Sequence, residues 1–328
     1  MKNKLITNPF ISHLELHLSC FGKVKSISSL RDLLSRFLNI GDTFSFRNST
    51  TNAFIDVLQI LLEDTTYRVI YTNLENPSIL NAIENFVPKN RRVQLDLMKL
   101  LLEGKFDEIE KTIAKSYGKK CIYLFSHVLW NCGVSLNIEK ISSRIKSNNQ
   151  ENLIIVDGAQ AIGNVANIFS KNFDKDLIDF YLGCTHKWLN TKNLLGFVYI
   201  SSSFNNTYRN ITDKIFIQDL FSVFAGKYDG SKTEHQMSSY DFNLLYQITK
   251  ELNMNIENFK FAKSKITQNF NFSEAYLIPN IYERTHNFFG VYGDRDNLNK
   301  LCDIFELSKY LIVDDKYLPH NYSWLRIV

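Results

Sequence analysis

Hydrophobic and polar positions follow two kinds of spacing along the chain, one typical of amphipathic helices and one typical of buried strands. Short apolar runs rich in β-branched and aromatic residues predict strands, and the stretches between them carry apolar residues at helical spacing. The predicted strands cover residues 67–71, 93–95, 121–125, 153–156, 178–182 and 196–200, and the predicted helices cover residues 52–62, 78–86, 105–116 and 138–145. Strand alternating with helix indicates an α/β fold with a mainly parallel sheet.

The pattern changes after residue 238. Helical spacing runs over residues 238–252 and again to about 267, followed by predicted strands at 287–292, 310–313 and 324–328 and a predicted helix at 298–307. This indicates a smaller C-terminal α+β domain. We therefore expect an N-terminal segment over residues 1–20, a large α/β domain over 21–250 and a small α+β domain over 251–328, a division that a chain of 328 residues can accommodate.

Composition narrows the class of protein. Hydrophobic residues make up 45% and charged residues 22%, as in an ordinary folded protein, and the net charge is only +4 with both signs mixed along the chain. We therefore expect no nucleic-acid partner and no membrane partner. No signal peptide is readable and no apolar stretch approaches 18 residues, so the expected location is the cytoplasm.

The pattern of metal-binding residue types points away from a metal centre. The five cysteines are widely spaced and form no CxxC pair, which disfavours a disulfide framework or a zinc site. His13, Glu15 and His17 would share one face of a strand, but a fourth ligand is missing. We interpret them as an exposed strand face and expect no metal.

The most informative polar residues lie between positions 153 and 200. Asp157 closes a predicted buried strand, and Lys187 follows the next predicted strand. Ligands of open α/β sheets bind in the crevice outside the carboxyl ends of the strands. We therefore expect the Asp157 carboxylate and the Lys187 amine to reach the same crevice.

Several motifs around these two residues resemble those of a known family. VDGAQAIG at residues 156–163, DFYLGCTHKWLN at 179–190 and GFVYI at 196–200 are similar to the cofactor-binding signature of the class V aminotransferase superfamily. The resemblance extends upstream to FSHVLWNCG at 125–133 and FRNSTTNA at 46–53. That superfamily of pyridoxal-phosphate (PLP) enzymes includes cysteine desulfurases, kynureninases and isopenicillin N epimerase-like proteins.

The resemblance implies a fold-type I architecture and pyridoxal 5'-phosphate as the cofactor. In this pattern Lys187 forms a Schiff base with the cofactor aldehyde, and Asp157 keeps the pyridine nitrogen protonated so that the ring can act as an electron sink. Gln160 would hydrogen-bond the phenolic oxygen of the ring. His186 would contact the phosphate.

Two further positions fit the same pattern. The hydroxyl residues Ser49, Thr50 and Thr51 precede an amphipathic helix, whose N-terminus offers N–H groups and a positive dipole to a phosphate. Near the end of the chain, Arg326 corresponds to the arginine with which the family binds the substrate α-carboxylate, a role that suits a bidentate guanidinium.

The chain departs from the family pattern at other positions. Asn76 stands where the family usually has a ring stacked on the cofactor, and Trp130 stands where relatives present a small polar residue to the substrate. The Gly-Thr pair contributed by a neighbouring subunit has only Met237-Ser238-Ser239 as its counterpart, which makes Ser238 a candidate cofactor contact. The resemblance implies a homodimer.

The expected function is that of a PLP-dependent enzyme acting on an amino acid, with an aminotransferase favoured by family membership. A carbon-sulfur lyase, a carbon-carbon lyase and an epimerase remain open, because all use a lysine that moves the Cα proton. A catalytically degenerate scaffold protein is the alternative from another class. A nucleotide enzyme is disfavoured because no GxGxxG or Walker segment is present.

Desulfuration through a persulfide is disfavoured on cysteine placement. That chemistry needs a nucleophilic cysteine on a loop shortly before the C-terminal arginine, and residues 308–325 contain none. Cys302 lies in an apolar helical run, which predicts a core position and an inert thiol.

Overall fold

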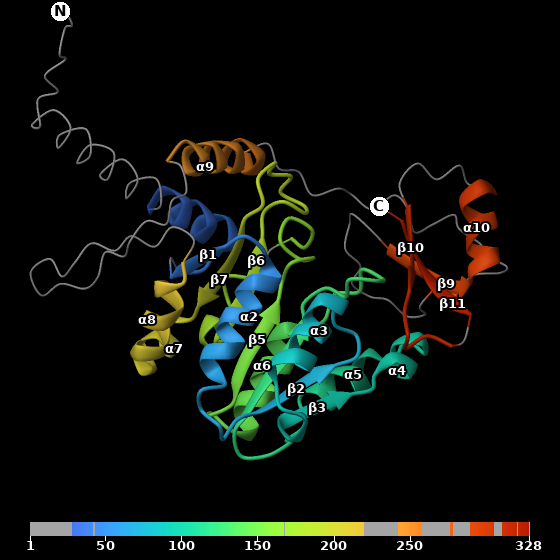
Figure 1. Ribbon diagram of the computed structural model, residues 1–328, viewed down its shortest axis with the longest axis horizontal. Coiled ribbons are helices and arrows are strands. Elements are labelled where there is room, and N and C mark those ends of the chain that lie inside the picture. Colours follow the sequence, from blue (N-terminus) through green and yellow to red (C-terminus); the bar gives the residue numbers. More distant parts are fainter. Residues whose placement is uncertain are drawn as a thin grey trace, which may run out of the picture.

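The structure is a computed structural model, which describes residues 28–41, 43–166, 168–219, 242–257, 276–277, 289–304, 310–319 and 321–327. Figure 1 shows a large α/β unit and, beside it, a small sheet with one helix. Among these residues no helix is long and apolar enough to cross a membrane. The same residues contain no cluster of three metal-ligating side chains. The His13, Glu15 and His17 positions lie outside the described residues.

A seven-stranded sheet organises the large unit, in the order β1-β7-β6-β5-β4-β2-β3. The four pairings from β3 to β6 are parallel, while β7 is antiparallel to both β6 and β1. The prediction of a mainly parallel sheet is therefore confirmed. The strands are β1 (Phe44–Arg47), β2 (Arg68–Thr72), β3 (Arg92–Leu95), β4 (Cys121–Ser126), β5 (Leu153–Asp157), β6 (Phe180–Cys184) and β7 (Gly196–Ile200).

Helices cover both faces of this sheet, as its parallel strands require. Alternate residues of β4 divide between two buried clusters, with Ile122 and Leu124 in one and Tyr123 and Phe125 in the other. The helices span residues 28–38, α2 (Thr50–Leu61), α3 (Pro77–Phe86), α4 (Met98–Leu102), α5 (Phe106–Ile113), α6 (Ile138–Asn148), α7 (Ser202–Thr207), α8 (Arg209–Ile217) and α9 (Phe242–Glu257). Short 3-10 turns cover Lys89–Arg91 and Lys175–Leu177.

The small unit is an antiparallel sheet in the order β10-β11-β9-β8. Its elements are β8 (Tyr276–Leu277), β9 (Phe289–Asp294), α10 (Arg295–Ile304), β10 (Tyr310–Asp314) and β11 (Tyr322–Ile327). Of these elements, β9, α10, β10 and β11 match the predicted C-terminal strands and helix to within a few residues, whereas β8 was not predicted. The predicted boundary at residue 250 falls inside α9, whose Ile248 and Leu252 belong to the core of the large unit. The division into three parts stays a prediction.

The two units touch at a glycine. The backbone N–H of Gly290 in β9 donates to the Cys132 carbonyl at 3.1 Å, and a Cβ on Gly290 would lie 2.2 Å from the Asn131 carbonyl oxygen. Only a residue without a side chain permits this approach. Since Gly290 is the register partner of Arg326 in β11, the contact holds the last strand against the loop that follows β4.

The strand β1 was not predicted from the sequence. It has four residues, all buried, and includes the polar Ser45 and Arg47. Arg47 forms an ion pair with Asp56 and donates to the Ile215 carbonyl at 2.8 Å. Asp56 and the Ile215 carbonyl, which is distant in sequence, supply the acceptors that a buried guanidinium needs. From its neighbours in sequence alone, Arg47 would be expected at the surface.

Candidate active site

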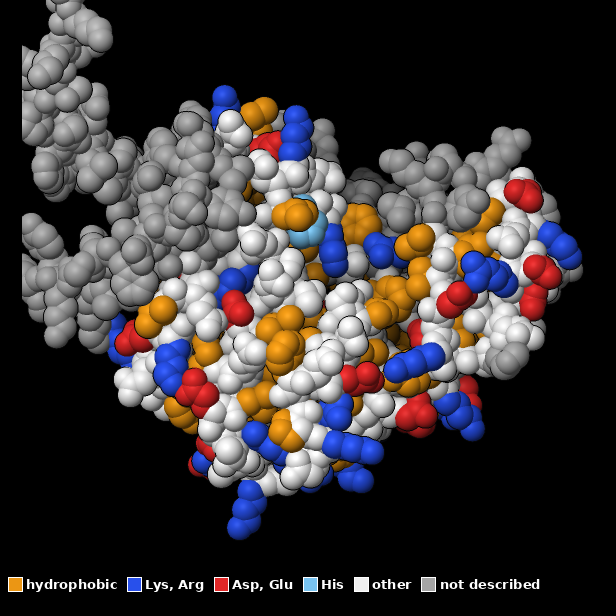
Figure 2. Space-filling view, viewed as in Figure 1, with side chains coloured by type: hydrophobic (Ala, Val, Ile, Leu, Met, Phe, Trp, Pro, Cys, Tyr) orange, Lys and Arg blue, Asp and Glu red, His pale blue; other side chains and the backbone are white. Residues whose placement is uncertain are grey.

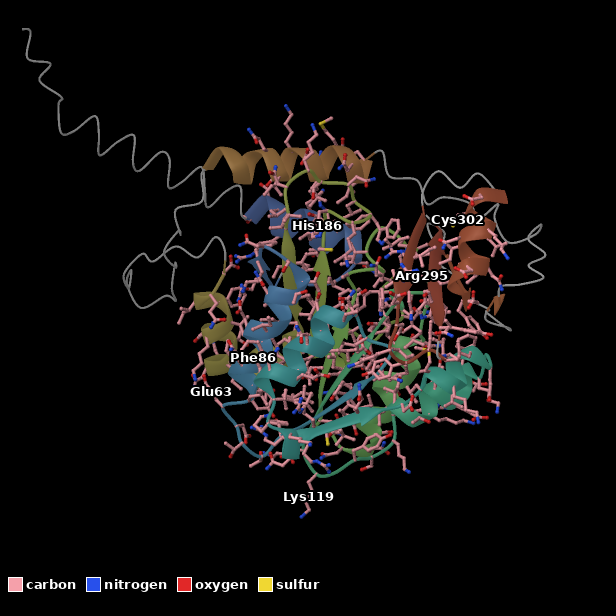
Figure 3. The ribbon with its side chains drawn as sticks, turned by 45° about the vertical axis from the view of Figure 1, so that its right-hand side comes forward. Glu63, Phe86, Lys119, His186, Arg295 and Cys302 are labelled. Atoms are coloured by element: carbon pink, nitrogen blue, oxygen red, sulfur yellow. The ribbon has the colours of Figure 1, made fainter. Side chains whose placement is uncertain are left out.

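One edge of the large sheet collects the carboxyl ends of β2, β4, β5 and β6. The strand β7 begins at the same edge, because Gly196 pairs with Cys184, and α2 begins there too. In Figure 3, His186 marks this edge beneath α9, and Lys119 marks the opposite end of the sheet. The predicted site residues from four different segments therefore share one end of the fold.

Asp157 and Lys187 follow neighbouring strands at this edge. Asp157 is the last residue of β5 and is buried, and its Oδ1 accepts a hydrogen bond from the Ala159 N–H at 2.9 Å. Burial raises the pKa of Asp157, while the positive charge of Lys187 and the Ala159 N–H act in the opposite direction. Lys187 itself is exposed. An exposed ammonium thus lies within electrostatic reach of a buried carboxyl.

The charge of Lys187 also acts on its neighbours. The pKa of His186 lies below its usual value, first because the ring is partly buried and second because Lys187 is beside it. Burial raises the pKa of the Cys184 thiol, and Lys187 partly offsets that rise. The site therefore favours a neutral imidazole next to a single exposed ammonium.

The start of α2 has the features of an anion site. Ser49 caps the helix by accepting from the Asn52 N–H at 3.1 Å, and helix N-termini present unpaired N–H groups and a positive dipole. Thr50 Oγ1 faces the Cys184 thiol, and the His186 ring faces the Leu195 backbone. Within the described residues, Thr50 Oγ1 and His186 Nδ1 are buried and have no well-aligned hydrogen bond to an oxygen or nitrogen, so both suit a phosphate oxygen bound beside this helix N-terminus.

Gly196 allows α2 to begin directly on the sheet edge. A Cβ at this position would lie 2.3 Å from the Ser49 carbonyl carbon and 2.7 Å from the Thr50 nitrogen. Because both atoms are backbone, Gly196→Ala is expected to displace the helix start and lower the free energy of unfolding by about 1–3 kcal/mol. Urea denaturation measures this change.

Gly41→Ala is the matched control for this substitution. A Cβ on Gly41 would meet the Tyr199 ring at 3.7 Å, an ordinary contact distance. The control is expected to change the free energy of unfolding by less than about 0.5 kcal/mol. Equal urea midpoints for the Gly196 and Gly41 variants would contradict the close packing of α2 on β7.

Gln160, Trp188 and Arg326 come together from three segments. Gln160 Oε1 accepts from Trp188 Nε1 at 3.0 Å and from an Arg326 terminal nitrogen at 3.4 Å. The Arg326 guanidinium lies 5.8 Å from the centroid of the Trp188 ring, within the range of a cation–π contact. No role was predicted for Trp188, although its position directly after Lys187 places it in the same turn.

Asn76 and Trp130 lie toward the small unit. Asn76 is the N-cap of α3 and accepts from the Ser78 N–H at 3.0 Å. Trp130 lines a cavity of about 470 Å³ between the start of α3 and the turn after β10, together with Glu75 and Asp315. Figure 2 shows hydrophobic side chains gathered where the two units meet. Ser238, the remaining predicted contact, lies outside the described residues.

Two buried ionisable groups near Asp157, Glu75 and His127, were not predicted as site residues from the sequence. Glu75 follows β2 and is 1% exposed. His127 follows β4, its Nδ1 lies 2.9 Å from the Tyr181 hydroxyl, and burial lowers its pKa to about 3, which leaves the ring neutral. A local signal existed for Glu75, since Thr72 stands three residues before it and directly follows the predicted strand, but spacing alone does not reveal burial.

The described cysteines are all buried and form no disulfide with one another, namely Cys121, Cys132, Cys184 and Cys302. Cys302 lies in α10 of the small unit, as Figure 3 shows, and burial raises the pKa of its thiol. The predicted core position of Cys302 is therefore confirmed. A buried thiol of raised pKa is a poor nucleophile.

Known proteins with this architecture identify the fold further. A solved NifS-like protein from Rickettsia africae has a TM-score of 0.63 and 15% identity, covering 93% of this chain and 82% of its own. The cystine C-S lyase C-DES, bound to its product cysteine persulfide, has a TM-score of 0.65 and 14% identity, covering 93% and 82%. A Sphingomonas wittichii serine palmitoyltransferase has a TM-score of 0.63 and 13% identity, covering 92% and 71%.

At these identities the likeness establishes the fold alone, which is that of fold-type I enzymes. No protein in the curated set matches the chain significantly. The family model described as aminotransferase class-V matches residues 14–213, more than half of the chain. The protein therefore belongs to the aminotransferase class-V family.

Proposed function

We propose that this protein is a pyridoxal-phosphate-dependent enzyme that acts on an amino acid by transamination. The observation that carries the proposal is the pairing of an exposed lysine with a buried aspartate at neighbouring strand ends, where the Lys187 charge acts on the Asp157 carboxyl. Membership of the aminotransferase class-V family supports the transfer of an amino group. A solved C-DES structure with glycine linked to its PLP cofactor has the same fold, with a TM-score of 0.66 and 16% identity.

The residues of the sheet edge suit the parts of this cofactor. The phosphate would bind at the start of α2 through Thr50, Thr51 and His186, where buried Thr50 Oγ1 and His186 Nδ1 have no well-aligned hydrogen bond within the described residues. Asp157 would accept a hydrogen bond from the pyridine nitrogen. When bound, the cofactor supplies an aldehyde that joins an amine and a ring that withdraws electrons from the substrate.

Lys187 performs two tasks in this proposal. Its amine would hold the cofactor aldehyde, and the same amine, once free, would act as the base that accepts the proton of the substrate Cα. The exposure of Lys187 leaves its amine open to both partners. Asp157 would supply the negative charge that favours a protonated ring nitrogen.

Arg326 and Gln160 orient the substrate and the ring. Arg326 would bind the substrate α-carboxylate, a planar anion that matches its guanidinium. Its contacts with Gln160 and with the Trp188 ring support this role, because they hold the guanidinium beside the turn that carries Lys187. Trp130 would border the substrate side chain from the cavity between the two units.

We also propose that the enzyme is a homodimer in which Ser238 and Asn76 border the cofactor. Light scattering tests the oligomeric state. A fully active monomer would contradict a site shared between two subunits.

The purified protein is expected to take up pyridoxal phosphate and to show a visible absorption band. A panel of amino acids, each paired with a keto acid acceptor, should then yield a new amino acid and a new keto acid. The matched control is the decarboxylated amine of the best substrate. Because it lacks the carboxylate that Arg326 binds, it is expected to react at least about 10-fold more slowly at equal concentration.

The products decide between the reactions that this site could perform. Sulfide or alanine release without transfer of the amino group would replace transamination by a lyase reaction, and loss of optical activity alone would replace it by epimerisation. A colourless protein that binds no added cofactor would contradict the enzyme proposal and favour a scaffold.

A further inference from the structure

Glu75 is a buried carboxyl without a cation. It lies directly after β2, is 1% exposed, and takes part in none of the ion pairs of the described residues. Its Oε1 accepts from the Thr72 hydroxyl at 2.7 Å and its Oε2 from the Ser126 hydroxyl at 2.5 Å. A buried carboxylate supported only by neutral donors is costly, so this arrangement favours the protonated acid.

The Ser126 side chain connects Glu75 to the position beside Asp157. Ser126, which donates to Glu75, is the register partner of Asp157 in the parallel pair β4 and β5. Register partners on adjacent strands lie about 4.8 Å apart and their side chains share one face of the sheet. Consistent with this placement, the negative charge of Asp157 raises the pKa of Glu75.

The two carboxyls have unequal support. Asp157 has the positive charge of Lys187 and the Ala159 N–H, whereas Glu75 has only uncharged partners, namely two hydroxyls and the Ser126 backbone. Burial is the main reason that the pKa of Glu75 rises from 4.5 to about 7, and the two hydroxyl hydrogen bonds only partly offset it. The anionic state is therefore favoured at Asp157 and the protonated state at Glu75.

Few other charges lie close to this pair. His127, which directly follows β4, is neutral because burial lowers its pKa to about 3. On β2 the neighbour is the hydroxyl of Thr72. The cavity that Glu75 helps to line also contains Glu84, Asp314, Asp315 and Lys316. Lys316 lies 3.6 Å from Glu84, so its charge is engaged there.

We propose that Glu75 is a positioning residue that carries the proton of the Glu75–Asp157 pair and so keeps Asp157 the sole anion beneath the cofactor ring. The inference rests on the proposed function. Loss of the Glu75 proton would add a second negative charge beside Asp157. The two carboxylates together would attract a positively charged ring nitrogen more strongly than Asp157 alone. Glu75 thereby gives the site a proton switch near neutral pH that acts through Asp157.

The first test uses the protein without cofactor. Because the folded chain keeps the Glu75 proton to higher pH than the unfolded chain, raising the pH from 4.5 to 7 disfavours folding. In Glu75→Gln this penalty is absent. The ratio of the variant's unfolding constant to that of the wild type is expected to fall by about two orders of magnitude across this pH range.

Glu84→Gln is the matched control, since Glu84 lines the same cavity but is exposed. Its unfolding constant relative to wild type is expected to stay within about 3-fold across the range. Carbon-13 NMR of the wild-type carboxyls provides a measurement that needs no variant. A carboxyl resonance titrating near pH 7 is expected, well above the midpoint of an ordinary glutamate.

The second test uses the cofactor-loaded protein. The visible band of the wild type is expected to change with pH in a step near 7, and this step should be absent from Glu75→Gln and present in Glu84→Gln. An identical step in wild type and Glu75→Gln would overturn the proposal, as would a carboxyl spectrum with no resonance titrating above about pH 6. A protein that binds no cofactor would contradict the proposed function, while the measurements on cofactor-free protein would still decide the protonation of Glu75.

Discussion

Replacing Lys187 by alanine is expected to abolish the visible band of the bound cofactor and to lower kcat by about 10³-fold or more, because the variant loses both the covalent link and the base that moves the Cα proton. The absorption spectrum and the rate of keto acid formation measure the two losses separately. Since Lys187 is exposed, the free energy of unfolding should change by less than about 0.5 kcal/mol.

Lys192→Ala is the matched control for this substitution. Lys192 is an exposed lysine five positions further along the same loop, and its backbone N–H, not its ammonium, contacts Glu251. The control is expected to keep the band and the rate. A Lys187 variant that keeps both the absorption band and the rate would show that another amine holds the cofactor. That result would contradict the role assigned to Lys187.

Replacing Lys187 should also shift the pKa values of the groups around it. The ammonium lowers the pKa of Asp157, of His186 and of the Cys184 thiol, so its removal raises all three. The variant therefore leaves the site with a more readily protonated imidazole and aspartate, and the loss of activity should not recover at low pH.

Asp157→Asn is expected to have the second largest effect, a fall in kcat/KM of about 10²- to 10³-fold. Asparagine keeps an oxygen that can accept from the Ala159 N–H, as Asp157 Oδ1 does at 2.9 Å, but it carries no charge to hold a proton on the ring nitrogen. Stability should move in the opposite direction. Burial raises the pKa of Asp157, so its ionised form costs folding energy at neutral pH that the amide does not.

Asp179→Asn provides the contrasting buried aspartate. Asp179 is also buried, and its Oδ2 lies 2.8 Å from Lys146 Nζ and accepts from the Ile154 N–H at 2.8 Å. Removing this charge leaves a buried ammonium unpaired and should destabilise the protein by about 3 kcal/mol, with little change in kcat for the molecules that remain folded. Loss of stability without loss of rate in Asp157→Asn would contradict its role at the cofactor.

Local sequence was sufficient to predict the two strand ends next to which Asp157 and Lys187 lie. The apolar run of β5 stops at Asp157, and β6 stops three residues before Lys187, so both side chains were expected at one sheet edge. The helix after Ser49 was predicted for the same reason, since its apolar spacing and its hydroxyl cap lie within one segment. These features depend on neighbouring residues, which a sequence pattern can read.

Features that depend on distant partners were not predicted. The four residues of β1 become a strand by pairing with β7, about 150 positions later in the chain, and Arg47 is buried because the Ile215 carbonyl and Asp56 receive its N–H groups. The partnership of Gln160, Trp188 and Arg326 likewise requires β11 to dock against the loop after β4. No local pattern encodes these contacts.

The sequence by itself therefore determined the alternation of strand and helix, the class V family signature, and the positions of Asp157 and Lys187 at the ends of adjacent strands. Only the tertiary structure decided which charges are buried together. Glu75 shows the physical reason, because its preference for a proton comes from exclusion of water and from Ser126 and Asp157 on two other strands. Periodicity reports which face of an element is apolar, but the environment of an ionisable group is set by the elements packed around it.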